Sequence, residues 1–279
     1  MHPPTWNRIT SCLRKYRVTF ALASLFLVAS VMITGCARKN TDTLVVGMEL
    51  DDPPFELIDT QGNPAGVSVD MAHALGESLH KKVVIENIPF DGLIVALKTG
   101  KIDLVISSMT ATEERKKSIN FSAPYLRTGL CLLVGKNSGI KSMADADKPG
   151  NVIAVKKGTT GEVYMREHAR HAKVLALDKE SACVMEVVQG KADAFIYDQM
   201  SVLKYWQRNK NTTQALLTPV QEDKWAIGVS KENTELLNQV NSFLQEFKKN
   251  GGFDKIADKW LKEQKQAFKE LGAPFTFGM

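Results

Sequence analysis

The sequence lacks the motifs of several large enzyme classes. Gly158-Thr-Thr-Gly161 has no lysine after its second glycine, as a phosphate-binding loop would require. No Gly-x-Ser-x-Gly nucleophile elbow occurs. The closest histidine pair, His168 and His171, is explained more simply by a polar helix face than by a metal site. We therefore expect neither a metal nor another cofactor.

Acidic residues are absent from the first 35 residues. This segment carries four bases and then an apolar run over 18–33 that is short for a transmembrane helix. Small residues before a cysteine complete the pattern of an export signal over 1–35. Ile33-Thr34-Gly35-Cys36 is similar to the lipobox of bacterial lipoproteins, which implies cleavage before Cys36 and lipidation of its sulfur. An uncleaved apolar anchor is the alternative.

Little net charge remains once that segment is removed, because 32 basic residues then face 31 acidic ones. Nucleic-acid binding would need a concentrated basic face, which nothing here indicates. The 244 residues from Cys36 onward are enough for two modest lobes or one large domain. No second hydrophobic run is long enough to span a bilayer, so we expect a soluble body.

Cysteine is scarce, with four in the whole chain. Cys12 is removed with the signal, and Cys36 would carry lipid. Cys131 falls in a predicted strand and Cys183 in a predicted helix, far apart in sequence. Two separately buried thiols are therefore favoured over a disulfide, which an oxidising compartment would permit.

Strand-like and helix-like segments alternate after a polar tether over 36–43. In the first half, strands are predicted at 44–48, 83–85 and 101–106, and helices at 67–79 and 93–97. A second series follows, with strands at 129–134, 152–155, 174–177 and 192–198 and with helices ending near 171 and 188. A strand at 225–229 and amphipathic helices at 236–247 and 253–260 come last, and the tail from Lys265 is weakly patterned. This order predicts α/β architecture with parallel sheets.

Polar side chains follow the predicted strand over 101–106. Ser107, Ser108 and Thr110 stand beside Arg115, and Thr112 is placed to cap a helix that begins with two glutamates. Ligands of open α/β sheets bind at the carboxyl ends of the strands, and a guanidinium there suits a carboxylate. The alternative is an ordinary loop in which Arg115 pairs with Glu113 or another nearby acid.

Other predicted strands also end on polar groups. Glu49 and Asp52 follow the first strand in a loop made rigid by Pro53 and Pro54, although from the residues alone a solvated turn is slightly favoured. In the second series the groups at the strand ends are Thr159, Thr160 and Asp198.

An ordered set of motifs resembles the polar amino-acid substrate-binding proteins of bacterial ABC importers, from Leu44 to Trp260. The matching segments are Pro53-Pro54-Phe55-Glu56, Gly66 with Asp70, Phe90-Asp91-Gly92-Leu93-Ile94, Lys101-Ile-Asp103, the run from Ser107 to Arg115, Phe121-Ser122 with Tyr125, Lys157-Gly158-Thr159, and Gly251 with Trp260. The resemblance implies a two-lobed type II periplasmic binding protein in which each lobe is a mostly parallel sheet flanked by helices. The first lobe would comprise 44–127 and 226–279, and the second 128–225.

The resemblance also implies roles for individual residues. Arg115 would clamp the α-carboxylate of an amino acid, helped by Thr110 and by the backbone near Thr160. Asp198 would take the α-ammonium, shared with Thr110 and the carbonyl of Ser108. Phe90 would pack on the carbon chain of the ligand. The full expected set is Glu49, Asp52, Phe90, Ser107, Ser108, Thr110, Arg115, Lys156, Thr159, Thr160 and Asp198.

The implied function is extracytoplasmic capture of a free amino acid by a lipid-anchored monomer in the periplasm or cell envelope, followed by delivery to an ABC permease. Glu49, Asp52 and Lys156 would face the ligand side chain with a combined charge of −1. That balance predicts a cationic or neutral polar side chain, as in arginine, lysine or glutamine, and rejection of an acidic one. We expect no enzymatic activity; the alternatives within this fold are a cyclohexadienyl dehydratase-like enzyme and a ligand sensor.

Overall fold

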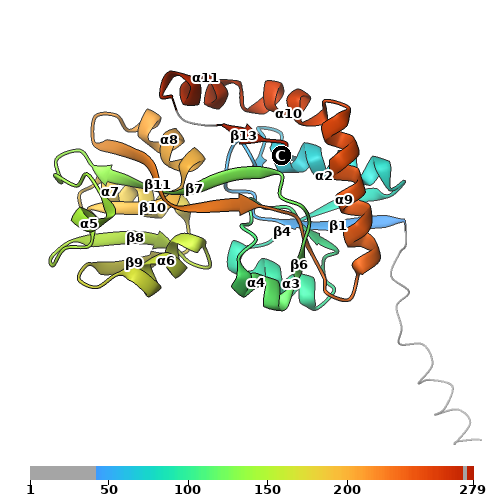
Figure 1. Cartoon of the computed structure of the whole chain (residues 1–279), viewed down its shortest axis with the longest axis horizontal. Helices are drawn as coiled ribbons and strands as arrows, with labels where there is room; N and C mark the ends of the chain where they lie inside the picture. Colours follow the sequence, from blue (N-terminus) through green and yellow to red (C-terminus); the bar gives the residue numbers. More distant parts are fainter. Residues whose placement is uncertain (1–41, 273–274) are drawn as a thin grey trace, which may run out of the picture. The chain divides into compact units, whose positions relative to one another are not determined.

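The computed structural model describes residues 42–272 and 275–279 of the chain. These residues contain two large β-sheets, each flanked by helices (Figure 1). We call the two parts built on these sheets the first lobe and the second lobe. The predicted signal peptide, Cys36 and most of the predicted tether lie outside the described residues. None of the helices in the described ranges is both long and apolar enough to span a membrane.

The sheet of the first lobe has the strand order β4-β1-β5-β12-β6. Strand β1 pairs in parallel with β4 and β5, whereas β12 is antiparallel to both of its neighbours. The strands are β1 (Thr43–Met48), β4 (Lys82–Asn87), β5 (Leu104–Val105), β6 (Asn120–Phe121) and β12 (Gly228–Val229). Its helices are α2 (Val67–Ser78), α3 (Leu93–Lys98), α4 (Glu113–Ser118), α9 (Thr234–Lys249), α10 (Gly252–Trp260) and α11 (Lys262–Glu270), with a 3₁₀ turn, η1 (Phe90–Gly92). Strands β2 (Leu57–Ile58) and β3 (Pro64–Ala65) form a small hairpin.

The sheet of the second lobe has the order β11-β7-β10-β8-β9. Its strands are β7 (Leu126–Gly135), β8 (Val152–Lys156), β9 (Lys173–Leu177), β10 (Ala194–Asp198) and β11 (Thr213–Trp225). Strands β8, β9 and β10 are parallel, and β7 is antiparallel to β10 and β11. The flanking helices are α5 (Met143–Ala146), α6 (Thr160–His168), α7 (Glu180–Val188) and α8 (Gln199–Arg208). Both sheets are therefore mixed, and the parallel pairing predicted from the sequence holds for part of each.

Two long strands run from the second lobe toward the first. Figure 1 shows β7 and β11 crossing the middle of the view, and they pair with each other as far as Leu126 and Trp225. The last strand, β13 (Thr276–Phe277), pairs with β7 on residues Arg127 and Leu126. The lobe limits predicted from the sequence fall close to these strands and stay a prediction.

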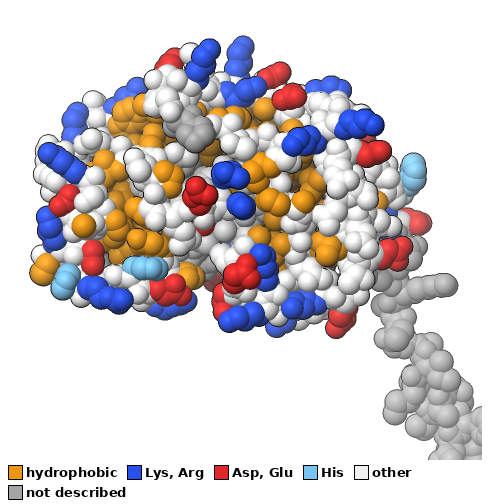
Figure 2. Space-filling view, in the orientation of Figure 1, with side chains coloured by type: hydrophobic (Ala, Val, Ile, Leu, Met, Phe, Trp, Pro, Cys, Tyr) orange, Lys and Arg blue, Asp and Glu red, His pale blue; other side chains and the backbone are white. Residues whose placement is uncertain are grey.

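Apolar burial explains why the helices cover the sheets. In the first lobe, α2 contributes Val69, Ala72 and Leu75 to the same buried cluster as Val46 and Met48 of β1. This spacing of three residues gives a helix one apolar face. Figure 2 shows acidic and basic side chains interspersed on the face in view, with no continuous basic stripe there.

The structure corrects several local predictions. The strand predicted at 101–106 is limited to β5, and the segment predicted as a strand at 225–229 contains the end of β11 and the whole of β12. Helix α8 and most of β11 were not predicted, and the weakly patterned tail from Lys265 contains most of α11. Cys131 and Cys183 are both buried free thiols, which confirms the favoured interpretation.

Candidate ligand-binding site

One cavity between the lobes is lined by all eleven predicted site residues. Five further residues line it: Glu56, Leu130, Tyr197, Asp223 and Trp225. Its volume is about 30 Å³, roughly the space of one or two water molecules. Side chains from both lobes therefore fill most of the space between the strand ends.

The loop after β5 presents Arg115 to this cavity. Thr112 caps α4 by accepting a hydrogen bond from the Arg115 backbone N–H at 3.2 Å, as predicted. Ser108 has a φ of 49°, a left-handed conformation that a non-glycine residue adopts at a cost of about 1 kcal/mol or more. The loop is therefore held in one shape by a helix cap at one end and a strained turn at the other.

The guanidinium of Arg115 bonds carbonyls rather than a carboxylate. Nη1 donates to the Thr110 carbonyl at 2.8 Å, and Nη2 donates to the Gly158 carbonyl of the second lobe at 2.9 Å. Glu113 pairs instead with Lys116, so the Arg115–Glu113 pair of the ordinary-loop alternative is wrong. Burial lowers the pKa of Arg115 to about 10, which still leaves the group protonated at neutral pH. Arg115 thus brings a positive charge that no acid in the described residues pairs with.

Asp223 of β11 connects the two lobes through hydroxyl groups. Its Oδ2 accepts hydrogen bonds from Thr110 Oγ1 at 3.1 Å and from Thr160 Oγ1 at 2.7 Å, while its Oδ1 accepts one from Gln221. Thr110 belongs to the first lobe and Thr160 begins α6 of the second. Sequence reasoning missed Asp223, because β11 was not predicted as an element.

Asp198 ends β10 and caps helix α8. Its Oδ1 accepts hydrogen bonds from the backbone N–H groups of Met200 at 2.9 Å and Ser201 at 3.0 Å. Burial, followed by the negative charge of Asp52, raises the pKa of Asp198 to about 7. This carboxylate combines a structural task with a place in the cavity lining, and a cation beside it would favour its ionised form.

Glu56, which is almost fully buried, supports the strained serine. Ser108 Oγ donates to both carboxyl oxygens of Glu56 at 3.1 Å, and Ser68 Oγ donates to Oε1. Burial, together with Asp52, raises the pKa of Glu56 well above its usual range. Glu56 belongs to the Pro-Pro-Phe-Glu motif, but nothing in its sequence position separated it from the other acids of the same loop.

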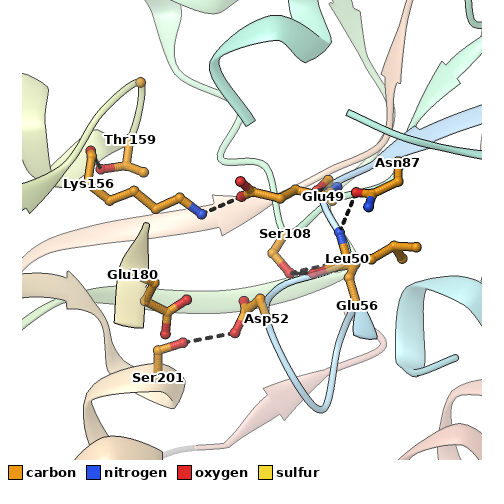
Figure 3. A network of polar contacts seen from close by, with 12 residues as sticks. Glu49, Leu50, Asp52, Glu56, Asn87, Ser108, Lys156, Thr159, Glu180 and Ser201 are labelled. Atoms are coloured by element: carbon orange, nitrogen blue, oxygen red, sulfur yellow. Dashed lines mark hydrogen bonds and ion pairs between the residues drawn. The ribbon is translucent and has the colours of Figure 1, made fainter. Parts of the chain in front are cut away.

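Glu49 and Lys156 form an ion pair across the cavity, drawn in Figure 3. Lys156 is 2% exposed, and its ammonium lies 5.8 Å from the centre of the Phe90 ring. Arg115 lies over the same ring at 5.3 Å, so Phe90 contacts cations from both lobes. The remaining hydroxyls are engaged locally: Ser107 accepts from the Glu49 N–H, and Thr159 donates to the Lys156 carbonyl.

Asp52 is paired with a cation that the sequence-based charge balance left out. Lys204 Nζ of α8 lies 3.0 Å from Asp52 Oδ1. Ser201 Oγ donates to the same oxygen at 3.2 Å, as Figure 3 shows. The solvated-turn alternative for this loop is wrong, because Asp52 is only 7% exposed. Lys204 was missed because a lone lysine on an unpredicted helix gives no sign of burial.

No group of three or more histidine, cysteine, aspartate or glutamate side chains within the described ranges is arranged to hold a metal ion. What the cavity does contain is a guanidinium with no ion-paired acid, several carboxylates and hydroxyls, and the rings of Phe90, Tyr197 and Trp225. Such a set can bind a small zwitterion through charge-assisted hydrogen bonds at both ends.

Comparison with known proteins identifies the family. Residues 44–263 match the model of the bacterial extracellular solute-binding proteins, family 3. The chain belongs to this family, and its mixed α/β fold is that of the type II periplasmic binding proteins.

Several relatives have named ligands. The glutamine-binding protein GlnH of a Bacillus subtilis ABC transporter is 30% identical over 88% of this chain and 97% of its own. An ancestral arginine-binding protein, solved with bound arginine, is 38% identical, covers 78% of this chain and 98% of its own, and superposes with a TM-score of 0.74. An ancestral arginine-binding protein has also been solved bound to glutamine, and it is 38% identical to this chain with a TM-score of 0.73.

A third relative bears on the enzyme alternative. The ancestral amino acid-binding protein AncCDT-1, described as a precursor of cyclohexadienyl dehydratase, is 38% identical over 79% of this chain and 96% of its own, with a TM-score of 0.73. The relatives named here are all binding proteins, and one of them is placed on a route toward an enzyme.

Proposed function

We propose that this protein binds a free L-amino acid with a cationic or neutral polar side chain in the cavity between its lobes and delivers it to an ABC permease. The observation that carries the proposal is Arg115, a guanidinium held on two carbonyls with no acid paired to it. A ligand α-carboxylate would supply the missing negative charge through a bidentate contact. The proposal agrees with the ligands of the named relatives.

The other end of the ligand backbone would meet Asp198. One carboxyl oxygen already accepts two backbone hydrogen bonds, and an α-ammonium would bind the other, with Thr110 and the Ser108 carbonyl beside it. Phe90 would cover the carbon chain, since its ring already packs against two cations at the cavity wall. Glu49, Asp52 and Lys156 would lie toward the ligand side chain.

Binding would require the lobes to separate and close again. A cavity of about 30 Å³ is far below the roughly 300 Å³ of a small-molecule site. Among the contacts between the lobes, we expect those of Arg115 with the Gly158 carbonyl and of Glu49 with Lys156 to part on opening. The ligand would replace these contacts with its own charged ends, and the closed form is the one offered to the permease.

We further propose that the protein is a monomer anchored through lipid on Cys36 in the periplasm or cell envelope, after removal of 1–35. A Cys36→Ser variant should bind amino acids normally and leave the membrane fraction. Membrane retention of this variant would instead assign the anchor to the apolar run over 18–33.

The proposal is tested by a thermal-shift screen of the purified protein against the twenty amino acids, ornithine and citrulline. A true ligand raises the melting temperature in proportion to the logarithm of its concentration over Kd. Recovery of the ligand unchanged after long incubation, checked by mass spectrometry, supports a binding protein, whereas conversion of the ligand supports the enzyme alternative. A screen in which no amino acid shifts the melting temperature would reject the proposal.

A further inference from the structure

A buried lysine lies directly behind the cavity wall. Lys204 of α8 is 7% exposed, and its ammonium contacts Asp52 Oδ1 at 3.0 Å, the Pro53 carbonyl at 3.0 Å and Glu180 Oε1 at 3.3 Å. The ammonium also lies 4.5 Å from the centre of the Tyr205 ring. All three N–H donors of the Lys204 ammonium therefore have an acceptor, and two of these acceptors belong to the loop that carries Asp52.

Two acidic side chains, Asp52 and Glu180, contact the single positive charge of Lys204. Glu180 is fully buried, and its Oε2 has no hydrogen-bond partner. Burial, followed by the charge of Asp52, raises the pKa of Glu180 to about 8, so this group is mostly protonated at neutral pH. Lys204 thus balances Asp52, while Glu180 adds little charge of its own.

Apolar packing next to the contact between Lys204 and Asp52 holds helix α8 against the Asp52 loop. Met200 and Leu203 of α8 belong to the same buried cluster as Phe55, which lies on the Asp52 loop. Asp52 is also tied to Glu56 by backbone hydrogen bonds in both directions. Because this cluster joins α8 to the loop of the first lobe, Lys204 stays beside Asp52 as a fixed part of the cavity wall.

This arrangement changes the charge available to a ligand side chain. Glu49 is paired with Lys156, and Asp52 is paired with Lys204. The four groups sum to zero, rather than to the −1 obtained when Lys204 is left out. Glu56 is another acid in the cavity lining. It is buried and accepts hydrogen bonds from the hydroxyls of Ser68 and Ser108.

We propose that Lys204 is a specificity-determining residue, an internal cation that occupies the side of Asp52 where a cationic ligand side chain would otherwise pair, so that the site prefers neutral polar amino acids such as glutamine to lysine and arginine. The inference rests on the proposed function and narrows its ligand class. A second cation brought to Asp52 would meet an already neutralised carboxylate and the like charge of Lys204. An amide would instead bond Glu49, Lys156 or Asp52 without adding charge.

Lys204→Gln removes the charge and keeps a hydrogen-bond donor. Calorimetric titration should show that the wild-type protein binds glutamine more tightly than lysine or arginine, and that the ratio of these affinities moves at least about tenfold toward the cations in the variant. In Lys204→Gln/Asp52→Asn the positive and negative charges are both removed, and the neutral preference should return. Lys210→Gln is the matched control, since it removes an exposed lysine that packs on Trp206 just beyond the same helix.

The results separate this inference from the proposed function. If no amino acid binds the wild-type protein, the proposed function fails and this inference fails with it. If amino acids bind but the wild type prefers lysine or arginine, or the ratio is unchanged in Lys204→Gln, the role of Lys204 is wrong while the proposed function stands. Should Lys204→Gln fail to fold by circular dichroism, Lys204→Met/Glu180→Gln removes the same cation together with one buried acid, and the same shift in ratio is required of it.

Discussion

The two walls of the cavity hold their charges in different ways. On the first lobe, Arg115 bonds only carbonyls, and both of these acceptors are uncharged. On the second lobe, Asp198 caps a helix and Lys156 is ion-paired, so each charged group already has a strong partner. The first wall therefore holds a positive charge that has no ion-paired partner. The charged groups of the second wall already make a helix cap and an ion pair.

This difference indicates which wall contributes more to ligand affinity. A guanidinium that exchanges two neutral acceptors for a carboxylate gains a charge-assisted bidentate contact. A carboxylate that keeps its two cap bonds and adds an ammonium gains a single contact. We therefore expect variants of the first wall to lose more affinity than variants of the second.

Arg115→Lys is expected to give the largest loss. The ammonium keeps the charge but cannot form two parallel hydrogen bonds with a carboxylate. The shorter side chain also loses the hydrogen bond to the Gly158 carbonyl. The expected cost is about 2 to 5 kcal/mol in binding free energy, measured by calorimetric titration with the best ligand of the screen. Arg166→Lys makes the same change on an exposed surface and should bind normally. Near-native affinity in Arg115→Lys would remove the proposed clamp.

Asp198→Asn should come second, with a loss of about 1.5 to 3 kcal/mol in binding free energy. Asparagine is as good a helix cap as aspartate, so the melting temperature of the unliganded protein should change little. The variant thereby separates the structural task of Asp198 from its charge. Asp258→Asn, an exposed counterpart, serves as control. If Asp198→Asn lost more affinity than Arg115→Lys, the ranking of the two walls would be reversed.

The pH dependence of binding sharpens the same comparison. With a pKa of about 7 in the unliganded protein, Asp198 must lose a proton before it can accept the ligand ammonium in acidic solution. Affinity should therefore be constant above about pH 8 and fall by up to about tenfold per unit below pH 7. The nearby charges of Asp52 and Lys204 are expected to stay paired over this range. Titrations from about pH 5 to about pH 8 should show this slope in the wild type and a much flatter one in Asp198→Asn.

Asp223→Asn should have the smallest effect, because Asp223 acts on both walls through hydroxyls rather than on the ligand directly. The amide oxygen can take the place of Oδ2 beside Thr110 and Thr160, but the amide nitrogen would then oppose the Gln221 donor. One lost hydrogen bond costs about 0.5 to 1.5 kcal/mol, visible as a lower melting temperature. Thr160→Val, which removes only the bond within the second lobe and keeps the one from Thr110 of the first lobe, should lower affinity without disturbing Gln221. A neutral outcome for both variants would show that the Asp223 network does not organise the cavity walls.

The sequence predicted those parts of the site that follow recognisable strand ends. Ser107, Ser108, Thr110 and Arg115 stand directly after a buried apolar segment, and Thr112 is followed by two acids that mark a helix start. Such local chemistry is visible without tertiary information. Phe90 and Lys156 were added by the family resemblance rather than by a local pattern. All eleven predicted residues line one cavity, although their contacts with a ligand stay a prediction.

The missed residues share a different property, because their importance comes from packing between distant segments. Asp223 lies on a long strand whose pairing register with β7 shifts between Leu216 and Gln221, so that no regular alternation marks it. Lys204 is buried only because α8 packs against a loop about 150 residues earlier in the chain. A charged residue on a helix is ordinarily exposed, and nothing in the sequence around Lys204 indicates that this lysine is buried.

The pairing of β13 with β7 has a practical consequence for anyone who handles this protein. Leu126 and Arg127 of the crossing strand are flanked by β11 on one side and by β13 on the other, and the Gly278 N–H donates to the Tyr125 carbonyl at 2.7 Å. Phe277 and Gly278 are thus fixed to a strand that joins the lobes. A small fluorophore attached beside them would therefore report the movement of that strand.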